Sequence, residues 1–295
     1  MIKRTQNNQL RFAYLWMGII LALYIVLRII PIITSFGMSF FNWDLINPKK
    51  KYVGFKNYSK LFNDDNFLIS IKNTLIFSFF VVLVSLSISL PMACALQKDF
   101  KGKGLFQSIY FIPYVIAVVP AALAWKFIYD PTGGILNRII QFFGGIPKGW
   151  LVNDKLALPS IMIMTIWQRI GYNLVIFTVG LGEIPKDYYE AAKVDGAGKL
   201  KTFFKITMPL LMPVTIYLVI MNTIEAFNIF TPVYVMTTGT QSAPASAVKV
   251  LVMDIYQNAF RFFKMGYASA ESVCLFLIVL IVSLLQMLYF KKRDK

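Results

Sequence analysis

Polar and ionisable side chains recur at helical spacing inside two long apolar stretches of this sequence. In residues 157–181 they lie at i, i+3, i+4 and i+7, on one helical face: Thr165, Gln168, Arg169 and Tyr172. In residues 204–226 a second face holds Asn222, Glu225 and Ala226. Amide, hydroxyl and guanidinium groups supply hydrogen bonds and charge, and a phenol ring supplies an apolar surface. The two faces are therefore candidates for the lining of a cavity that admits a polar solute.

The charged members of these faces also have a purely structural interpretation. Ionisable groups in apolar stretches are costly to bury and are often neutralised by pairing. Arg169 and Glu225 can pair with each other, or with Arg28 and Glu271 in two other apolar stretches. Asn173 lies on the opposite side of its helix, a position typical of a polar contact between helices. The sequence leaves both interpretations of the charged residues open.

The composition excludes most enzyme chemistry on this chain. None of the 295 residues is a histidine, which excludes histidine acid–base catalysis, a Ser-His-Asp triad and the commonest zinc and iron ligand sets. Cys94 and Cys274 both lie in apolar runs and are predicted to be buried free thiols. The sequence also lacks a Gly-Lys-Ser/Thr phosphate-binding loop. We therefore expect no catalytic residue, no metal site and no cofactor on this chain.

The overall composition is that of a membrane protein. Hydrophobic residues make up 57% of the chain and charged residues 15%, against about 25% charged residues in a typical soluble domain. The formal net charge is +16, so the basic residues must gather outside the apolar stretches. This distribution argues against a basic nucleic-acid-binding domain and indicates a lipid bilayer as the surroundings of the chain.

Six apolar stretches are long enough to cross a bilayer as helices. They cover residues 13–36, 74–96, 105–127, 157–181, 204–226 and 268–290. The stretches are continuous rather than alternating, which excludes a transmembrane β-barrel. The prediction is an all-α polytopic membrane protein with six transmembrane helices, a single domain over residues 1–295 whose core is 70–290.

Basic residues predict the orientation of these helices. The amino terminus, residues 97–103, residues 182–205 and the tail 291–295 carry Lys and Arg at a higher density than the loops on the other side. By the positive-inside rule both termini are then cytoplasmic. The lysine-rich segment 49–60 opposes this orientation.

The predicted cytoplasmic segment 182–205 is patterned as two short helices rather than as a simple connection. Pro185 suits the first turn of a helix, and Glu190 lies near the positive end of that helix. Gly196 should end it, and a short basic helix then leads to Pro209. An amphipathic connector lying on the membrane surface is the alternative interpretation.

This segment resembles the EAA motif of permeases from binding-protein-dependent ABC importers. The motif reads Glu-Ala-Ala, three residues, Gly, nine residues, Ile, one residue and Leu-Pro. Here it comprises Glu190, Ala191, Ala192, Gly196, Ile206, Met208 and Pro209. Met208 in place of Leu is the single departure, and it replaces one apolar side chain by another.

The resemblance extends over nearly the whole chain and is most specific to carbohydrate-type permeases. The match is to the first permease of a pair, similar to the larger membrane subunit of the maltose system. It rests on residues 53–58, 66–67, 73–74, 111–114, 125, 130–131, 134–137 and 266–270. It implies the type I ABC importer permease fold in a bacterial or archaeal cell membrane. The implied partners are a second permease subunit in a heterodimer, two cytosolic ATPase subunits that hold ATP and Mg, and an extracytoplasmic solute-binding protein.

The resemblance also implies roles for individual residues. Helix 186–198 becomes a cytoplasmic coupling helix that docks in a groove of the ATPase, through the EAA residues together with Asp195. The two polar faces become the path of a carbohydrate, expected to be an oligosaccharide. Arg169 would suit the carboxylate of an acidic, uronate-containing saccharide. The rival function is an ion-coupled secondary transporter of a small polar solute, which would need ion-relay groups and usually inverted repeats.

Overall fold

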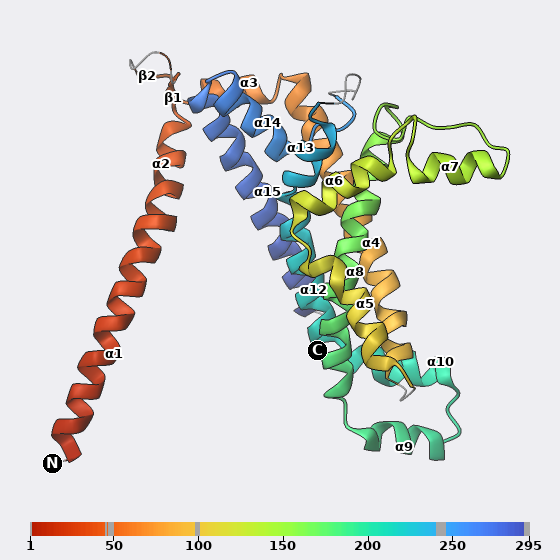
Figure 1. Cartoon of the computed structure of the whole chain (residues 1–295). Coiled ribbons are helices and arrows are strands. Elements are labelled where there is room, and N and C mark those ends of the chain that lie inside the picture. The colour runs from red at the N-terminus through yellow and green to blue at the C-terminus, as the bar shows by residue number, and fades with distance from the viewer. Residues whose placement is uncertain (1, 45, 47–49, 98–100, 240–245, 292–295) are drawn as a thin grey trace. The chain divides into compact units, whose positions relative to one another are not determined.

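The computed structural model is mostly helical (Figure 1). It describes residues 2–44, 46, 50–97, 101–239 and 246–291. Three parts of the orientation argument lie outside these described residues: Lys49, residues 98–100 and the basic tail beyond residue 291. The chain divides into two compact units, which we call the first unit and the second unit.

The first unit comprises residues 1–64 and 255–276. Its elements are α1 (Ile2–Tyr24), the π-helix η1 (Ile25–Ile29), α2 (Ile30–Met38), β1 (Phe41–Asn42), β2 (Lys51–Tyr52), α3 (Lys56–Leu61), the π-helix η3 (Gln257–Arg261) and the start of α15 (Met265–Lys291). The two strands pair antiparallel, with Phe41 opposite Tyr52. Pro31 explains η1, because it lacks the N–H that would bond to the Leu27 carbonyl in a regular helix.

Close backbone approach joins the strands of the first unit to α15. Asn57 donates hydrogen bonds to the carbonyls of Ser39 and Phe41, at 2.8 and 3.0 Å. Gly266 donates its N–H to the Trp43 carbonyl at 3.1 Å. A Cβ atom at Gly266 would collide with the carbonyl oxygen of Phe41. Glycine is therefore the residue that this junction accepts.

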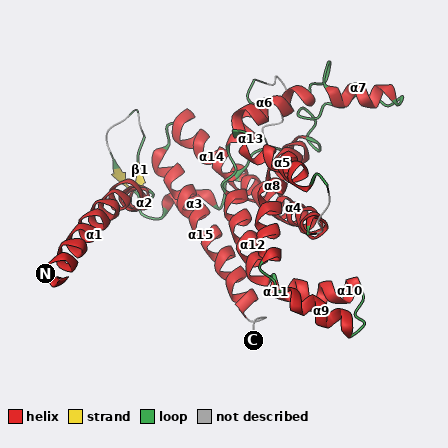
Figure 2. Cartoon of the chain, turned by 60° about the horizontal axis from the view of Figure 1, so that its bottom comes forward, coloured by secondary structure: helices red, strands yellow, loops and turns green. Residues whose placement is uncertain are grey.

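The second unit comprises residues 65–254 and 277–295. Its elements are α4 (Asp65–Leu96), α5 (Lys103–Val115), α6 (Val118–Ile128), α7 (Ile135–Phe142), α8 (Ala157–Gly182), α9 (Lys186–Val194), α10 (Lys199–Thr202), the π-helix η2 (Phe203–Thr207), α11 (Met208–Leu210), α12 (Met212–Phe227), α13 (Thr231–Thr237), most of α14 (Leu251–Tyr256) and the end of α15. Helix α4 packs along α8 and α12, α5 packs along α8, and α13 packs against α6 (Figures 1 and 2). Buried apolar side chains form one cluster among α4, α6, α8 and α13 and another among α4, α8 and α12.

Four helical spans in the described part of the chain are long and apolar enough to cross a bilayer. They are Tyr14–Met38, Asp65–Leu96, Ala157–Gly182 and Met265–Lys291. Each contains most or all of one predicted stretch. The span at Ala157–Gly182 differs from the prediction by one residue, whereas Asp65–Leu96 begins well before the predicted start at residue 74. The number of spans rises to six if each of two bent helix pairs counts as one.

The prediction of unbroken helices over 105–127 and 204–226 is wrong. Helices α5 and α6 meet at an angle of 97°, and the helical segment Lys199–Leu210 meets α12 at 67°. Pro120 and Pro213 explain these breaks, because a proline lacks an N–H and its ring collides with the carbonyl four residues earlier. Each proline instead lies in the first turn of a new helix, where neither penalty applies.

Helices α5 and α8 touch through their backbones at Gly171. A Cβ atom there would collide with the carbonyl oxygen of Tyr110 and would lie 3.2 Å from the Cα atom of Phe111. Small residues at helix contacts allow this close approach in membrane proteins. The missing side chain of Gly171 therefore sets the distance between α5 and α8.

We predict that Gly171→Ala separates α5 from α8 and lowers the free energy of unfolding by about 1–3 kcal/mol, the usual cost of overpacking. Gly18→Ala is the matched control, because no atom lies within 4 Å of a Cβ built at Gly18. Thermal unfolding of the two purified variants in detergent measures the difference. Equal unfolding temperatures would contradict the contact.

Candidate functional site

A polar cavity of about 650 Å³ lies in the second unit, where the bend between α5 and α6 faces α8, α12 and the start of α13. Its polar lining residues are Tyr114, Thr165, Gln168, Arg169, Glu225, Asn228 and Thr231. The structure thus brings together Thr165, Gln168, Arg169 and Glu225 of the predicted path. Tyr172, Asn222 and Ala226 lie outside the lining.

Arg169 on α8 and Glu225 on α12 form a salt bridge at this cavity. Their side chains retain 23% and 39% exposure, so the pair is open to the cavity on one side. The sequence allowed Arg169 and Glu225 to pair with each other or with Arg28 and Glu271, and the structure contains the first of these pairings. Glu271, in the first unit, instead accepts a hydrogen bond from Asn258 at 2.9 Å, and Arg28 on η1 is exposed. The two charges of the Arg169–Glu225 pair cancel, so together they add no net charge to the cavity.

Gln168 holds the bend between α5 and α6. Its Nε2 atom lies 3.4 Å from the carbonyl oxygens of both Pro113 and Ile116. The Ile116 carbonyl has no helical partner, because the residue four positions later is Pro120. A carbonyl left without a donor in a bilayer costs several kcal/mol. Gln168 therefore stabilises the bend and lines the cavity at the same time.

An aromatic surface lies at the edge of the cavity. The Tyr114 ring, which lines the cavity, stacks on the Tyr172 ring with 4.9 Å between centroids. The Tyr172 hydroxyl lies 3.0 Å from the Tyr217 hydroxyl. Tyr172 thus packs against Tyr114, and of these two rings the one that lines the cavity is that of Tyr114.

Asn222 and Ala226 are buried between helices, at 2% and 4% exposure. Asn222 donates to the Asn173 side-chain oxygen at 2.9 Å and to the Leu218 carbonyl at 2.7 Å. Asn173 in turn donates to the Ser85 hydroxyl at 3.2 Å. The interhelical contact expected of Asn173 is confirmed, and Asn222 belongs to the same chain of hydrogen bonds.

Three polar lining residues were missed from the sequence as cavity residues: Tyr114, Asn228 and Thr231. Asn228 follows Glu225 by three positions, and this spacing was a usable signal. Tyr114 and Thr231 lie on other elements, and no spacing along α8 or α12 relates them to the two polar faces.

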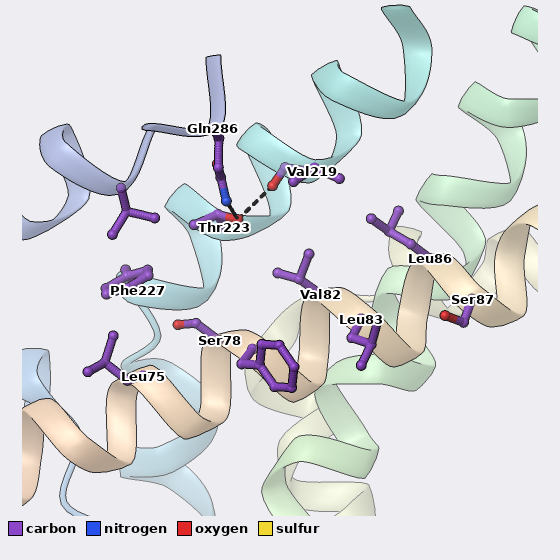
Figure 3. A pocket seen from close by; sticks show the side chains of 12 residues that line it. Leu75, Ser78, Val82, Leu83, Leu86, Ser87, Val219, Thr223, Phe227 and Gln286 are labelled. Carbon is purple, nitrogen blue, oxygen red and sulfur yellow. Dashed lines mark hydrogen bonds between the residues drawn. The ribbon is translucent and has the colours of Figure 1, made fainter. Parts of the chain in front are cut away.

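A second groove, of about 440 Å³, lies between α4, α12 and the end of α15 (Figure 3). Most of its lining is apolar, and none of its lining residues is charged. Gln286 donates to the Thr223 hydroxyl at 3.0 Å, and Thr223 donates to the Val219 carbonyl at 2.7 Å, as the dashed lines in Figure 3 show. The first bond joins α15 to α12 and the second lies within α12, so Gln286 and Thr223 are already paired with each other, and the groove has fewer groups for a polar solute than the first cavity.

The described residues contain no group of three or more His, Cys, Asp or Glu residues that could hold a metal ion. Cys94 and Cys274 are free thiols and are half-buried rather than buried. The groups at the cavity of the second unit supply hydrogen bonding, ring stacking and ion pairing.

The segment predicted as two short helices forms α9 and α10 (Figure 1). Helix α9 begins after Pro185 and ends before Gly196. Gly196 has a φ of +69°, in the left-handed region that glycine favours after a helix. The Tyr189 hydroxyl lies 3.3 Å from the Thr207 hydroxyl, which links α9 to the approach to α12.

The residues of the EAA-like motif divide between an exposed and a packed set. Glu190, Ala191, Asp195, Gly196 and Pro209 are exposed. Ala192 is buried and Ile206 is half-buried. The carboxylates of this segment are thus open to a partner, while Ala192 and Ile206 pack against the chain itself.

Comparison with known proteins decides the family. Residues 15–295 match the model of the family described as binding-protein-dependent transport system inner membrane component. The chain belongs to this family. As an inner membrane component it is a multi-pass membrane protein, and its apolar helices are membrane-spanning segments.

Several curated relatives of this inner membrane component cover most of its length. The probable ABC transporter permease protein YurN of Bacillus subtilis is 33% identical over 97% of both chains. The sn-glycerol-3-phosphate transport system permease protein UgpA of Agrobacterium fabrum is 34% identical over 85% of this chain and 84% of its own. The trehalose/maltose transport system permease protein MalF of Thermococcus litoralis is 30% identical over 94% of this chain and 92% of its own. These relatives are transport permeases rather than enzymes.

A solved structure shares the fold. One chain of a bacterial ABC transporter involved in the import of the acidic polysaccharide alginate matches with a TM-score of 0.85 at 22% identity, over 99% of both chains. A second structure of that transporter, in complex with an alginate pentasaccharide-bound periplasmic protein, matches equally well, with a TM-score of 0.85. The fold of the chain is therefore that of an ABC importer permease.

We predict that the Arg169–Glu225 pair is energetically coupled. Arg169→Gln or Glu225→Gln leaves one partly buried charge without its partner, and each should lower the unfolding temperature. The double variant should recover most of the loss, with a coupling free energy of about 0.5–3 kcal/mol. Thermal unfolding of the two single variants and the double variant measures this value, and additive losses would refute the coupling.

Proposed function

We propose that this chain is a permease subunit of an ATP-driven importer of carbohydrate, and that its solute is an oligosaccharide. The observation that carries the proposal is the cavity beside the Arg169–Glu225 pair. It combines amide, hydroxyl and paired charged groups with the exposed ring of Tyr114. Sugar hydroxyls suit the polar groups, and the C–H face of a sugar ring suits an aromatic surface. The names of the relatives support a sugar or a sugar-like polyol as the class of solute.

An acidic saccharide is the second candidate solute. Arg169 presents a guanidinium to the cavity, and a guanidinium fork matches carboxylate geometry. In the structure this group is occupied by Glu225, so a uronate would have to displace Glu225 to bind Arg169. A neutral oligosaccharide needs no such exchange. The shared fold with an alginate importer is why this candidate is kept.

We predict that Arg169→Gln separates the two solutes. If a uronate binds Arg169, the variant should lose transport of an acidic oligosaccharide by about tenfold or more, the loss expected when a charged hydrogen bond of roughly 1.5–3 kcal/mol disappears. Transport of a neutral oligosaccharide of equal length should change less. Uptake of both by the reconstituted importer measures the difference. Equal changes for the two would eliminate the acidic candidate.

We further propose that α9 couples the permease to a separate ATPase subunit. Glu190 is an exposed anion on a short helix, suited to a charge-assisted hydrogen bond with a basic residue of a partner groove. The buried Ala192 and the contact from Tyr189 to Thr207 join α9 to the segment that leads into α12. When the ATPase subunits close and move α9, this movement would be passed on to α12, which carries Glu225. The cavity would then open alternately to the two sides of the membrane.

We predict that Glu190→Ala and Gly196→Pro each uncouple transport from ATP hydrolysis while the membrane segments stay folded. Glu183→Ala is the matched control, because Glu183 is also exposed but precedes α9. Solute uptake and solute-stimulated ATPase activity of the reconstituted importer are the measurements. Survival of both activities in the two variants would show that α9 is not the coupling element.

The remaining partners follow from the same proposal. They are a second permease subunit, two cytosolic ATPase subunits with ATP and Mg, and an extracytoplasmic solute-binding protein. Both termini of this chain lie in the cytoplasm in this proposal.

An ion-coupled secondary transporter is the rival function. Affinity purification of the tagged chain separates the two, because an ABC importer brings down another permease and an ATPase. A chain purified alone, or only with copies of itself, would favour the rival.

A further inference from the structure

Helix α7 of the second unit presents a row of large apolar side chains that are all exposed. Ile135, Ile139 and Phe142 follow one another at i, i+4 and i+7, on one helical face. Ile135, Ile139 and Phe142 are 60%, 49% and 86% exposed, and Phe143 and Ile146, which follow the helix, are 81% and 84% exposed. A soluble surface seldom carries so many large apolar groups together, so this row indicates a surface that another phase or molecule covers.

The chain holds α7 in place through specific contacts. Asn137 is 2% exposed; it donates to the Lys148 carbonyl at 2.9 Å and accepts from the Lys148 N–H and the Trp150 indole, both at 3.0 Å. A Cβ atom at Gly134 would collide with the backbone of Asp130. The exposed apolar row is therefore part of a well-defined structure.

The turn that precedes α7 is also built around one side chain. The carboxylate of Asp130 accepts a hydrogen bond from the Thr132 hydroxyl at 2.7 Å and from the N–H groups of Thr132 and Gly133 at 2.9 and 2.8 Å. The same bonds, first that of the Thr132 hydroxyl, lower the pKa of Asp130. The Asp130 carboxylate is therefore ionised at neutral pH and accepts the hydrogen bonds that hold the turn. These bonds weaken only as the pH falls through the lowered pKa of Asp130.

The remaining surface of α7 has two further sides. Leu136 packs against the apolar cluster of the unit, and Asn137 is buried, so these residues form the side that faces the protein. Arg138 and Gln141 are exposed at i and i+3 and form a polar side. The apolar row, the protein-facing side and the polar side thus occupy three different sectors of the helix. This division fits a helix that lies on a membrane beside its own protein.

The direction of α7 agrees with that arrangement. In Figures 1 and 2, α7 runs across the direction of α8 and extends outward from the end of the unit opposite α9. Helix α8 is a membrane-spanning helix, so a helix that runs across it at its end lies along the membrane surface. Side chains on that helix can reach the boundary between headgroups and acyl chains.

We propose that α7 is an interfacial anchor, with its apolar row inserted at the headgroup–acyl boundary of the leaflet opposite α9. Arg138 and the exposed Lys148 would pair with phosphates of phospholipid headgroups, which supplies the charge complementarity that a lipid partner requires. Amphipathic helices of this kind insert about 5–10 Å below the surface. The inference is independent of the solute and of the ATPase, so it stands or falls separately from the proposed function.

The test compares two neighbouring positions on α7. In a background with Cys94→Ala and Cys274→Ala, Phe142→Cys and Gln141→Cys each receive an environment-sensitive fluorophore, since both side chains are exposed. The full-length chain with its co-purifying partners is placed in nanodiscs of phosphatidylethanolamine and phosphatidylglycerol. We expect brominated lipid to quench the probe at position 142 several-fold more than the probe at 141. Iodide in the water should show the opposite preference.

Three outcomes would overturn the proposal. Equal quenching of the two probes by brominated lipid would show that the apolar row does not enter the bilayer. Protection of position 142 from iodide without quenching by lipid would show that a protein subunit covers it. Protection that appears only when a solute-binding protein is added would make α7 a docking surface for that protein.

A double variant tests the phosphate contacts. Arg138→Gln with Lys148→Gln should weaken lipid quenching of the probe at position 142 in nanodiscs that contain phosphatidylglycerol. Unchanged quenching would show that these two residues do not contact the lipid phosphates.

Discussion

Every backbone carbonyl inside a hydrocarbon layer needs a hydrogen-bond donor, and the cavity of the second unit depends on how this constraint is met. Pro120 removes the donor that the Ile116 carbonyl would have in a continuous helix. The chain bends by 97° at this point, and Gln168 reaches across from α8 to donate instead. The bent backbone then forms one wall of the cavity. The break in the helix and the polar side chain that compensates for it together create the site.

Polar pairs between helices have a second role in this unit. Lipid tails provide no hydrophobic drive for helices to associate, so packing and interhelical hydrogen bonds decide which helices become neighbours. Arg169 with Glu225, and Asn173 with Asn222, both join α8 to α12. The first pair opens to the cavity and the second is buried. One contact of this helix pair is thus available to a solute, while the other keeps the helices together.

The sequence locates four of the apolar spans because the length of a span is set by the thickness of the bilayer. The span at 157–181 was predicted to within one residue. The bends were missed because hydropathy averaged over a window does not register where Pro120 and Pro213 fall relative to a helix start. Helical spacing correctly grouped Gln168 and Arg169. It could not show that Asn222 turns toward Asn173, because spacing gives the face of a helix and not its neighbour.

The contact at Gly171 has a mechanical consequence for the cavity. Because the backbone of α5 rests directly on α8 there, the two helices cannot approach each other more closely without a backbone collision. Helices α5 and α8 together carry Gln168, Arg169 and the near side of the bend. The opposite wall, with Glu225 and Asn228, belongs to α12 and its end. If the width of the cavity changes while this contact holds, the change comes from α12, or from α6 turning about the bend, and the Arg169–Glu225 pair spans the distance that changes.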